Sequence, residues 1–442
     1  MSAEPKFPEV PLGTLEQHDP EKSHPTSTSS SHHAVDTIEA KSDISDFPEG
    51  GARAWMVAAG TASILFCTLG YTNSFGIFQA YYMENQLRHE TPDRIAWIGS
   101  LQSFLLFASG SVGGPLFDRY GPKVIWPAAI LYIFAIMMTS LCKEYWQFML
   151  AQGVLTGIAN GLLMFPSMAA TPQYFSKKRG AAMGIALAGS SLGGVIFPIA
   201  LAKMLTESTL GFAWSMRICG FIMIPFLAFS CVAIRARLPP RDTSFFLLSP
   251  FRIPLFNTLI IAEFCLMIGM FSPLIFLPSF AIQIGVDPAL ASYLVAMLNG
   301  ASIFGRILPG FLADRFGRLN MLAAAGATTG ILVLVWPQVT GTAGVVAFAV
   351  FFGFCSGAIV SGGSVALSMC PEDPKETGTY LGQGMAFASL AALVGPPATG
   401  ALLERYGGYV QISIFGGVLT LVGAALAFAC KMATKKGLWG NI

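Results

Sequence analysis

The sequence GPLFDRYGPK at residues 114–123 and its near copy GFLADRFGR at residues 310–318 decide the fold class of this chain. The two copies begin 196 positions apart, and each lies between two long apolar runs. Each copy predicts a turn at a membrane surface, because its charged side chains can stay hydrated there while glycine allows a tight reversal. The repetition predicts a membrane protein built from two similar halves.

The composition also points to a membrane protein. Of the 442 residues, 54% are hydrophobic and 11% are charged, whereas soluble domains carry about 25% charged residues. The net charge of +2 gives no indication of a nucleic-acid partner. All five histidines lie outside the apolar runs and no two cysteines have metal-ligand spacing, so we expect neither a metal site nor a cofactor.

Twelve apolar runs are long enough to cross a bilayer, which takes about 20 residues in a helix. The expected spans are residues 54–82, 94–117, 123–142, 146–173, 180–203, 212–234, 255–283, 291–313, 319–337, 344–369, 378–402 and 408–432. The longest break between them, at 235–254, separates the sixth span from the seventh.

The distribution of Lys and Arg predicts the orientation, because cytosolic loops carry an excess of both. With both termini cytosolic, the outer side has six such residues and the inner side has fifteen. The inner set is Arg119, Lys123, Lys177, Lys178, Arg179, Arg235, Arg237, Arg241, Arg252, Arg315, Arg318, Lys375, Lys431, Lys435 and Lys436.

The two halves match beyond the charged turns. At an offset of 198, Gly180 corresponds to Gly378 and Gly184 to Gly382. The fold class expected is therefore an all-α polytopic membrane protein, with twelve transmembrane helices in two parallel-repeat halves and both termini cytosolic. We expect a disordered cytosolic tail at 1–50, six-helix halves at 51–235 and 255–434, a central cytosolic loop at 236–254 and a cytosolic tail at 435–442.

These features resemble the major facilitator superfamily, whose signature turn matches residues 114–123 and 310–318. Finer motifs resemble its monocarboxylate porter branch, especially the fungal members. The matching segments are PEGG at 48–51 with Trp55, FQAYY at 78–82, YFSKKRG at 174–180, AGSSLGG at 188–194 and GPPATG at 395–400. The resemblance implies the major facilitator fold and transport by alternating access.

The chain departs from the animal members of that branch at two positions. Asn73 stands where they carry a Lys, and Ser302 stands where they carry an Asp, whereas their eighth-span Arg is present as Arg306. The resemblance thus implies a site that binds anions but argues against simple lactate–proton symport.

Arg306 and Glu263 are the charged residues well inside apolar runs. An Arg at that depth costs at least about 2.5–3.5 kcal/mol unless it faces a cavity or a partner, so Arg306 either binds an acidic substrate or braces its helix. Glu263 lies at a similar depth on the neighbouring span, where the two could pair. We interpret Glu263 as the proton-coupling residue, and a permanent ion pair or a Glu that reaches the inner surface as the alternatives.

Polar residues within the spans complete the expected substrate site. Asn73, Gln102 and Ser302 could hydrogen-bond the substrate, while hydrogen bonding between helices is the alternative for Asn73 and Gln102.

The charged turns predict a gate. Asp118, Arg119, Asp314 and Arg315 are expected to form ion pairs at the cytosolic surface, with membrane anchoring as the alternative. The resemblance implies that these pairs lock the outward-facing state. Small residues and prolines should allow two spans to bend and pack closely: Gly189, Gly193, Gly194 and Pro198 in the fifth, and Pro396 and Pro397 in the eleventh.

These observations favour a secondary active transporter that moves a small acidic organic molecule, acting as an efflux pump for a fungal secondary metabolite. The alternative is proton-coupled uptake of a monocarboxylate or of a vitamin such as riboflavin. The expected partners are the substrate, the lipid bilayer and protons, in the plasma membrane or alternatively the vacuolar membrane. An enzyme is not expected, because the spans lack a constellation of nucleophile, acid and base.

Overall fold

A computed structural model describes residues 47–206, 208–241 and 247–434, and every regular element in these ranges is a helix. The expected tails at 1–50 and 435–442 fall largely outside these ranges, as does part of the central loop. The first half contains α2 (Gly51–Thr72), α3 (Phe75–Glu84), α4 (Pro92–Ala108), α5 (Gly110–Tyr120), α6 (Ile125–Thr139), α7 (Tyr145–Phe148), a π-helix (Met149–Thr156), α8 (Gly157–Ala170), α9 (Arg179–Thr206) and α10 (Gly211–Ala233).

The second half is more regular. It contains α11 (Pro254–Gln283), α12 (Pro288–Phe316), α13 (Arg318–Val335), α14 (Gly341–Leu367), α15 (Thr377–Tyr406) and α16 (Tyr409–Ala433). These bounds agree with the expected spans to within a few residues, because bilayer thickness sets the length of each apolar run. The first expected span is divided at Asn73 and Ser74, between α2 and α3.

Eleven helical stretches among the described residues are long and apolar enough to cross a membrane. One of them, Arg94–Thr139, has 46 residues and would measure about 69 Å as one helix, more than twice the hydrocarbon thickness of about 30 Å. The chain reverses within it at Gly121, whose φ of 65° ends α5 before a short 3₁₀ turn leads into α6. The stretch therefore supplies two crossings, and the described chain makes twelve.

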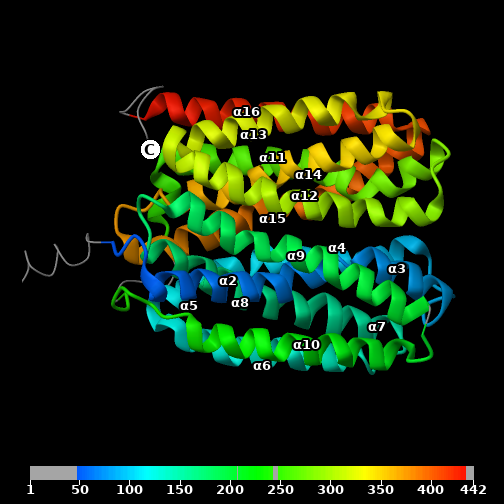
Figure 1. The fold of residues 1–442 in the computed structure, drawn as a ribbon, viewed down its shortest axis with the longest axis horizontal. Coiled ribbons are helices and arrows are strands. Elements are labelled where there is room, and N and C mark those ends of the chain that lie inside the picture. The colour runs from blue at the N-terminus through cyan, green and yellow to red at the C-terminus, as the bar shows by residue number, and fades with distance from the viewer. Residues whose placement is uncertain (1–46, 207, 242–246, 435–442) are drawn as a thin grey trace, which may run out of the picture. The chain divides into compact units, whose positions relative to one another are not determined.

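Within residues 47–434 the helices run roughly parallel in two groups (Figure 1), α2 to α10 below and α11 to α16 above. Helix α2 begins and α16 ends at the same end of this bundle, as an even number of crossings requires. We call this the terminal end, and the opposite end, where α3 lies, the open end.

Closely crossing helix pairs join the two halves, and they use equivalent positions of the repeat. In α9, Gly180 and Gly184 lie against the backbone of Gly310 and Arg306 in α12. In α15, Gly378 and Gly382 lie in the same way against Gly114 and Gly110 in α5. Any side chain at these four α9 and α15 positions would overlap a carbonyl group of the other half, so the absence of a Cβ permits the close approach.

The small residues expected to shape the fifth span pack α9 against α2 as well. A Cβ at Gly189 would overlap the carbonyl of Ala62, and one at Gly193 would overlap that of Phe66. Gly194 lies against the side chains of Asn73 and Asn299. The prolines lie inside continuous helices: Pro198 in α9, and Pro396 and Pro397 in α15.

We expect Gly382→Ala to lower the melting temperature of the purified protein, because its Cβ would force α15 away from the carbonyl of Gly110. Overpacking of this kind costs about 1–3 kcal/mol. Gly400→Ala is the matched control, because it lies on the same helix with open space around its Cα. Equal melting temperatures for the two variants would show that α15 and α5 can move apart at Gly382 without a loss of stability.

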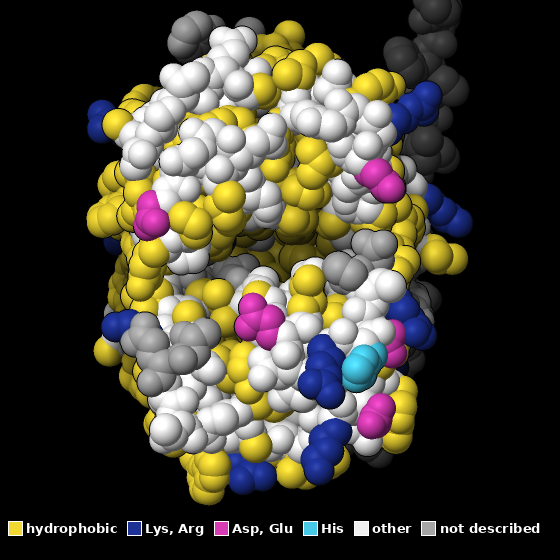
Figure 2. Space-filling model, turned by 90° about the vertical axis from the view of Figure 1, so that its right-hand side faces the viewer, with side chains coloured by type: hydrophobic (Ala, Val, Ile, Leu, Met, Phe, Trp, Pro, Cys, Tyr) yellow, Lys and Arg dark blue, Asp and Glu magenta, His cyan; other side chains and the backbone are white. Residues whose placement is uncertain are grey.

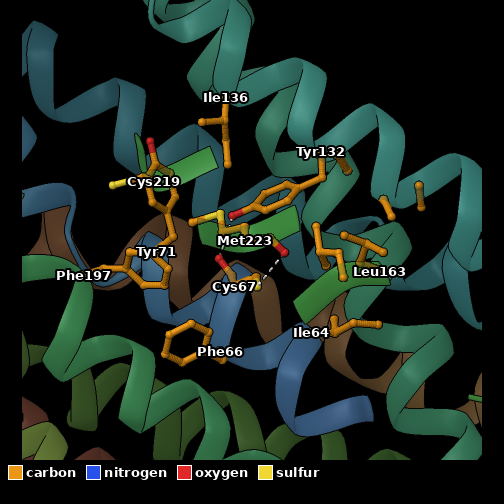
Figure 3. Close-up of a cluster of buried hydrophobic side chains, with 14 of the residues drawn as sticks. Ile64, Phe66, Cys67, Tyr71, Tyr132, Ile136, Leu163, Phe197, Cys219 and Met223 are labelled. Carbon is orange, nitrogen blue, oxygen red and sulfur yellow. Dashed lines mark hydrogen bonds between the residues drawn. The ribbon is translucent and has the colours of Figure 1, made fainter. Parts of the chain in front are cut away.

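The interior of the first half is organised around α2 (Figure 3). Tyr132 of α6 donates its hydroxyl to the carbonyl of Cys67 at 2.8 Å, and the Cys67 thiol points to the carbonyl of Met223 in α10. Tyr71 packs against Phe197 of α9 on the other side. Helix α2 is thus held by α6, α9 and α10 together. All eight cysteines are free thiols, and six of them are buried.

Candidate functional site

A cavity lies between the two halves, with about 970 Å³ of space between atoms, including its opening. The open end of the molecule (Figure 2) is hollowed between the halves, and the hollow is surrounded by hydrophobic side chains. Helices α2, α4, α8, α9, α11, α12, α14 and α15 all contribute to the cavity wall. Both halves of the repeat therefore form the site.

The cavity wall is mostly apolar and rich in flexible and aromatic side chains. These are Phe107, Phe271, Phe352, Met164, Met267, Met270 and Met385. Methionine adapts to ligands of irregular shape, and phenylalanine offers flat surfaces for stacking. Arg306 is the one charged side chain among the described residues of the wall.

Arg306 is 8% exposed, and α9 holds it in place. Its Nη1 donates to the carbonyl of Leu187 at 2.7 Å and to the hydroxyl of Ser190. Its Nε is buried without a hydrogen-bond partner, and no described carboxylate forms an ion pair with it. The residue therefore braces α12 against α9 and still presents an uncompensated positive charge to the cavity.

Asn73 and Ser302 line the cavity together with Arg306. Asn299, which the sequence analysis did not identify, also lines it and faces Gly194 next to Asn73. Its position on α12, seven residues and two helical turns before Arg306, was the available signal. These side chains place hydrogen-bonding groups on both halves of the wall.

The structure places Gln102 outside the cavity wall. It is 1% exposed, and its amide donates to the hydroxyl of Thr72 at 3.4 Å, which also accepts from Asn160. The next residue, Ser103, lines the cavity instead. One step along a helix turns a side chain by about 100°, so Gln102 faces α2 and α8 rather than the cavity.

Glu263 and Arg306 do not form the pair that their similar depth suggested. Arg306 faces α9, whereas the carboxyl group of Glu263 lies against Gly363 of α14. Glu263 is 1% exposed, and neither of its carboxyl oxygens has a hydrogen-bond partner among the described residues. Depth alone did not determine which neighbouring helix each side chain would face.

A carboxylate of the first half joins the two halves at the terminal end, on one side of the molecule. Asp118 accepts from the backbone amides of Gly378 at 3.0 Å and Thr379 at 2.6 Å, and from the Thr379 hydroxyl at 2.7 Å. Arg241 of the central loop donates its backbone amide to the carbonyl of Asp118 and its guanidinium to Thr379. Asp118 thus binds the amino end of α15, where unpaired amides favour an anion.

The equivalent contact joins the halves on the other side. Asp314 accepts from the backbone amides of Gly180 at 2.8 Å and Ala181 at 2.9 Å, at the amino end of α9. Arg318 bridges Asp314 and the carbonyl of Ser176, and Arg179 donates to the carbonyl of Ser368 at 2.9 Å. Each arginine therefore crosses from its own half to the other.

The ion pairs expected of Arg119 and Arg315 are not the contacts that the structure gives them. Both arginines are exposed, and their guanidinium groups lie over the neighbouring rings of Tyr120 and Phe316. Unpaired amides at the helix ends compete for the aspartates, and the buried setting favours them over hydrated arginines. The arginines that contact the other half are Arg179, Arg241 and Arg318. The sequence signal for Arg179 and Arg318 was their position, because each follows a turn and begins a helix.

Glu49 holds the segment before α9 from within the same half. Its carboxylate accepts from the backbone amides of Ser176 at 2.8 Å, Lys177 at 2.6 Å and Lys178 at 3.1 Å. Burial tends to raise the pKa of Glu49, but these amides and the charge of Lys177 outweigh it, and the pKa is lowered. The amino end of α9 is thus shared between Glu49 and Asp314.

We expect Glu49→Gln to lower the stability of the purified protein by about 1 kcal/mol at neutral pH, as the loss of a helix cap does. Because the folded-state pKa is lowered, the ionised carboxylate stabilises the fold above the unfolded pKa, and this stabilisation disappears as the pH falls through the folded pKa. The melting temperatures of wild type and variant should therefore converge in acid.

Melting curves in detergent from neutral pH to about pH 3, a range that spans the ordinary Glu titration, would measure this. Glu84→Gln changes an exposed glutamate at the open end and is the control. A difference between wild type and Glu49→Gln that persists in acid would contradict a charge-based role.

Comparison with known proteins gives one family and a consistent set of relatives. The model of the Major Facilitator Superfamily matches residues 60–382 and 259–441. The chain is 50% identical over 391 residues to the aspyridones efflux protein apdF of Emericella nidulans, covering 88% of this chain and 80% of that protein. It is 39% identical to the agnestins efflux protein AgnL12 of Paecilomyces divaricatus, covering 87% of this chain and 89% of that protein.

Solved structures share the fold at low sequence identity. The human organic anion transporter MFSD10 has a TM-score of 0.71 at 15% identity, covering 86% of this chain and all of that one. The transporter FucP in its outward conformation has a TM-score of 0.66 at 15% identity, covering 86% of this chain and 99% of that one.

Proposed function

This chain belongs to the major facilitator superfamily of multi-pass membrane transporters, and we propose that it exports a small acidic organic molecule, a secondary metabolite, by alternating access. The observation that carries the proposal is Arg306, a buried cation in the cavity wall whose Nε has no hydrogen-bond partner among the described residues. A carboxylate or an enolate of the cargo would supply the missing negative charge. The relatives named as efflux proteins for aspyridones and agnestins support the direction.

The chemistry of the cavity defines the cargo further. Three phenylalanines and four methionines in the wall favour a largely apolar molecule with flat parts. Asn73, Asn299 and Ser302 would orient its other polar groups, and Arg306 would hold its acidic group. A lactate-sized anion would leave most of this apolar surface without contact.

The state of the two ends fits one step of an export cycle. The terminal end is closed by Asp118, Asp314 and the crossing arginines, while the cavity opens at the other end. The excess of Lys and Arg assigns the terminal end to the cytosol. In this assignment the structure is the outward-open state from which cargo leaves, and we place it in the plasma membrane, with the vacuolar membrane as the alternative.

Transport into inside-out vesicles, with an imposed pH gradient and without ATP, tests the proposal. Aspyridone and a panel of aromatic carboxylic acids would be compared with neutral aromatic compounds of the same size. We expect the acids to accumulate and the neutral compounds not to. Accumulation only in right-side-out vesicles would favour proton-coupled uptake instead, and equal transport of neutral compounds would overturn the role assigned to Arg306.

A further inference from the structure

Glu263 has an unusual environment for a carboxyl group. It is 1% exposed in the middle of the second half, and both of its oxygens are buried without a hydrogen-bond partner among the described residues. An ionised carboxylate without a partner in such surroundings is very costly, and a buried acid avoids this cost by holding its proton. These surroundings therefore favour the neutral acid over the carboxylate.

The fold makes room for this carboxyl group. Its oxygens lie against the Cα of Gly363 in α14, and any side chain at that position would overlap them. The neighbouring residue Ser364 and Val360, one turn before Ser364, line the transport cavity, as does Met267, one turn after Glu263 on α11. The carboxyl group of Glu263 thus lies beside the cavity wall, next to its lining residue Ser364 on α14 and one turn of α11 from Met267.

No neighbouring helix supplies a counter-charge. Helices α12 to α16 all pack against α11. Their charged and titratable side chains are Tyr293, Arg306, Asp314, Arg315, Arg318, Cys355, Tyr380, Glu404, Arg405, Tyr406, Tyr409, Cys430 and Lys431. Among the described contacts, none of them forms a hydrogen bond or ion pair with Glu263. Burial rather than a partner therefore decides the charge of Glu263.

We propose that Glu263 is the proton-binding site that couples transport to the proton gradient; this rests on the proposed export function. In the outward-open state the carboxyl group holds its proton. When the terminal end opens, water reaches Glu263, its O–H bond breaks and the proton passes to water on the cytosolic side. Reprotonation in the outward-open state, from the cavity side, completes the exchange of one inward proton for outward cargo.

The first experiment needs no cargo. Infrared spectra of the protein reconstituted in lipid vesicles would be recorded over a pH titration, for wild type and Glu263→Gln. We expect a protonated carboxylic acid band that titrates in wild type and is missing in Glu263→Gln. A Glu263 band that does not change with pH, or none at all, would overturn the proposal and leave Glu263 as a structural group.

The second experiment measures coupling with aspyridone as the probe. Glu263→Gln cannot release a proton, so gradient-driven accumulation should fall at least tenfold while exchange of labelled for unlabelled aspyridone continues. Glu404→Gln, at an exposed glutamate on α15, is the control and should behave as wild type. Gradient-driven accumulation by Glu263→Gln at the wild-type rate would refute coupling at this residue.

The outcomes separate the two proposals. Wild-type protein that moves no acid under any gradient, yet retains the titrating Glu263 band, refutes export but supports the proton site. Wild-type protein that exports the acid regardless of the gradient supports export and overturns coupling through Glu263. Gly363→Ala gives an independent check, because its side chain would displace the carboxyl group and should shift the infrared band.

Discussion

Export of an acidic cargo should fall at least about tenfold when Arg306 is replaced by alanine. A hydrogen bond to a charged group contributes about 1.5–3 kcal/mol, which corresponds to about 10- to 150-fold in binding. We expect the loss of export for acidic compounds and not for neutral ones, because Arg306 is the one charged side chain among the described residues of the cavity wall. Arg306→Lys should retain part of the activity, since it keeps the charge but loses the planar guanidinium.

Initial rates in inside-out vesicles, measured for aspyridone and for a neutral aromatic compound, would check this prediction. Arg405→Ala is the control, because Arg405 is an exposed arginine at the open end of α15. Melting temperatures would show how much of the loss comes from the missing brace to Leu187 and Ser190. Unchanged export of the acid by folded Arg306→Ala protein would assign Arg306 to the brace alone.

Asp118→Asn should open the terminal end. Asp118 accepts three hydrogen bonds from Gly378 and Thr379, and asparagine keeps one acceptor but turns a donor toward an amide. Losing about 2–3 kcal/mol from the closed state would shift the balance between the two conformations by about 30- to 150-fold. Asp314→Asn should have a smaller effect, because Asp314 accepts two hydrogen bonds from the other half whereas Asp118 accepts three.

Distances between spin labels at Lys123 and Glu372, both exposed at the terminal end, would measure the opening. The labelled distance should lengthen in Asp118→Asn and net export should decrease. Asp373→Asn is the control, because Asp373 also accepts from a backbone amide, that of Lys375, but within a single half. An unchanged distance in Asp118→Asn would mean that the aspartate only anchors the turn.

The sequence predicted the parts of the structure that follow from bilayer physics and from the repeat. The span bounds agree because each apolar run has to match the membrane thickness. Asp118 and Asp314 occupy equivalent positions and make equivalent contacts because the halves repeat, as do Gly180 and Gly378. The fold could therefore be derived without coordinates, and so could the equivalence of Asp118 and Asp314, whereas their role as a gate stays a prediction.

The direction of individual side chains could not be derived. Gln102 and Ser103 are both polar and adjacent, yet only Ser103 lines the cavity. Glu263 and Arg306 lie at similar depths but face α14 and α9 respectively. Periodicity indicates which residues share a helix face, but the spans are apolar on all sides and the pattern does not reveal which neighbour each face meets.

Contacts between segments that lie far apart in the sequence could not be predicted either. Glu49 binds the amides of residues 176–178, more than 120 positions away, and across the halves Asp118 and Asp314 bind backbone amides rather than Arg119 or Arg315. A sequence does not show which backbone amide will act as a donor, since every residue except proline carries one. The motifs identified the acids but not what they bind.

Because Asp118 and Asp314 bind backbone amides, comparison of related sequences gives little information about the contacts that join the halves. Four of the bonds that Asp118 and Asp314 accept come from backbone amides of the other half, so most substitutions at the residues that supply those amides leave these bonds intact, provided that proline is avoided and the glycines stay small. Correlated substitution between the halves should therefore be weak at the contacts that join them. A method that infers contacts from covariation would underestimate this interface, and the cavity lining could diversify for new cargo without any compensating change at the gate.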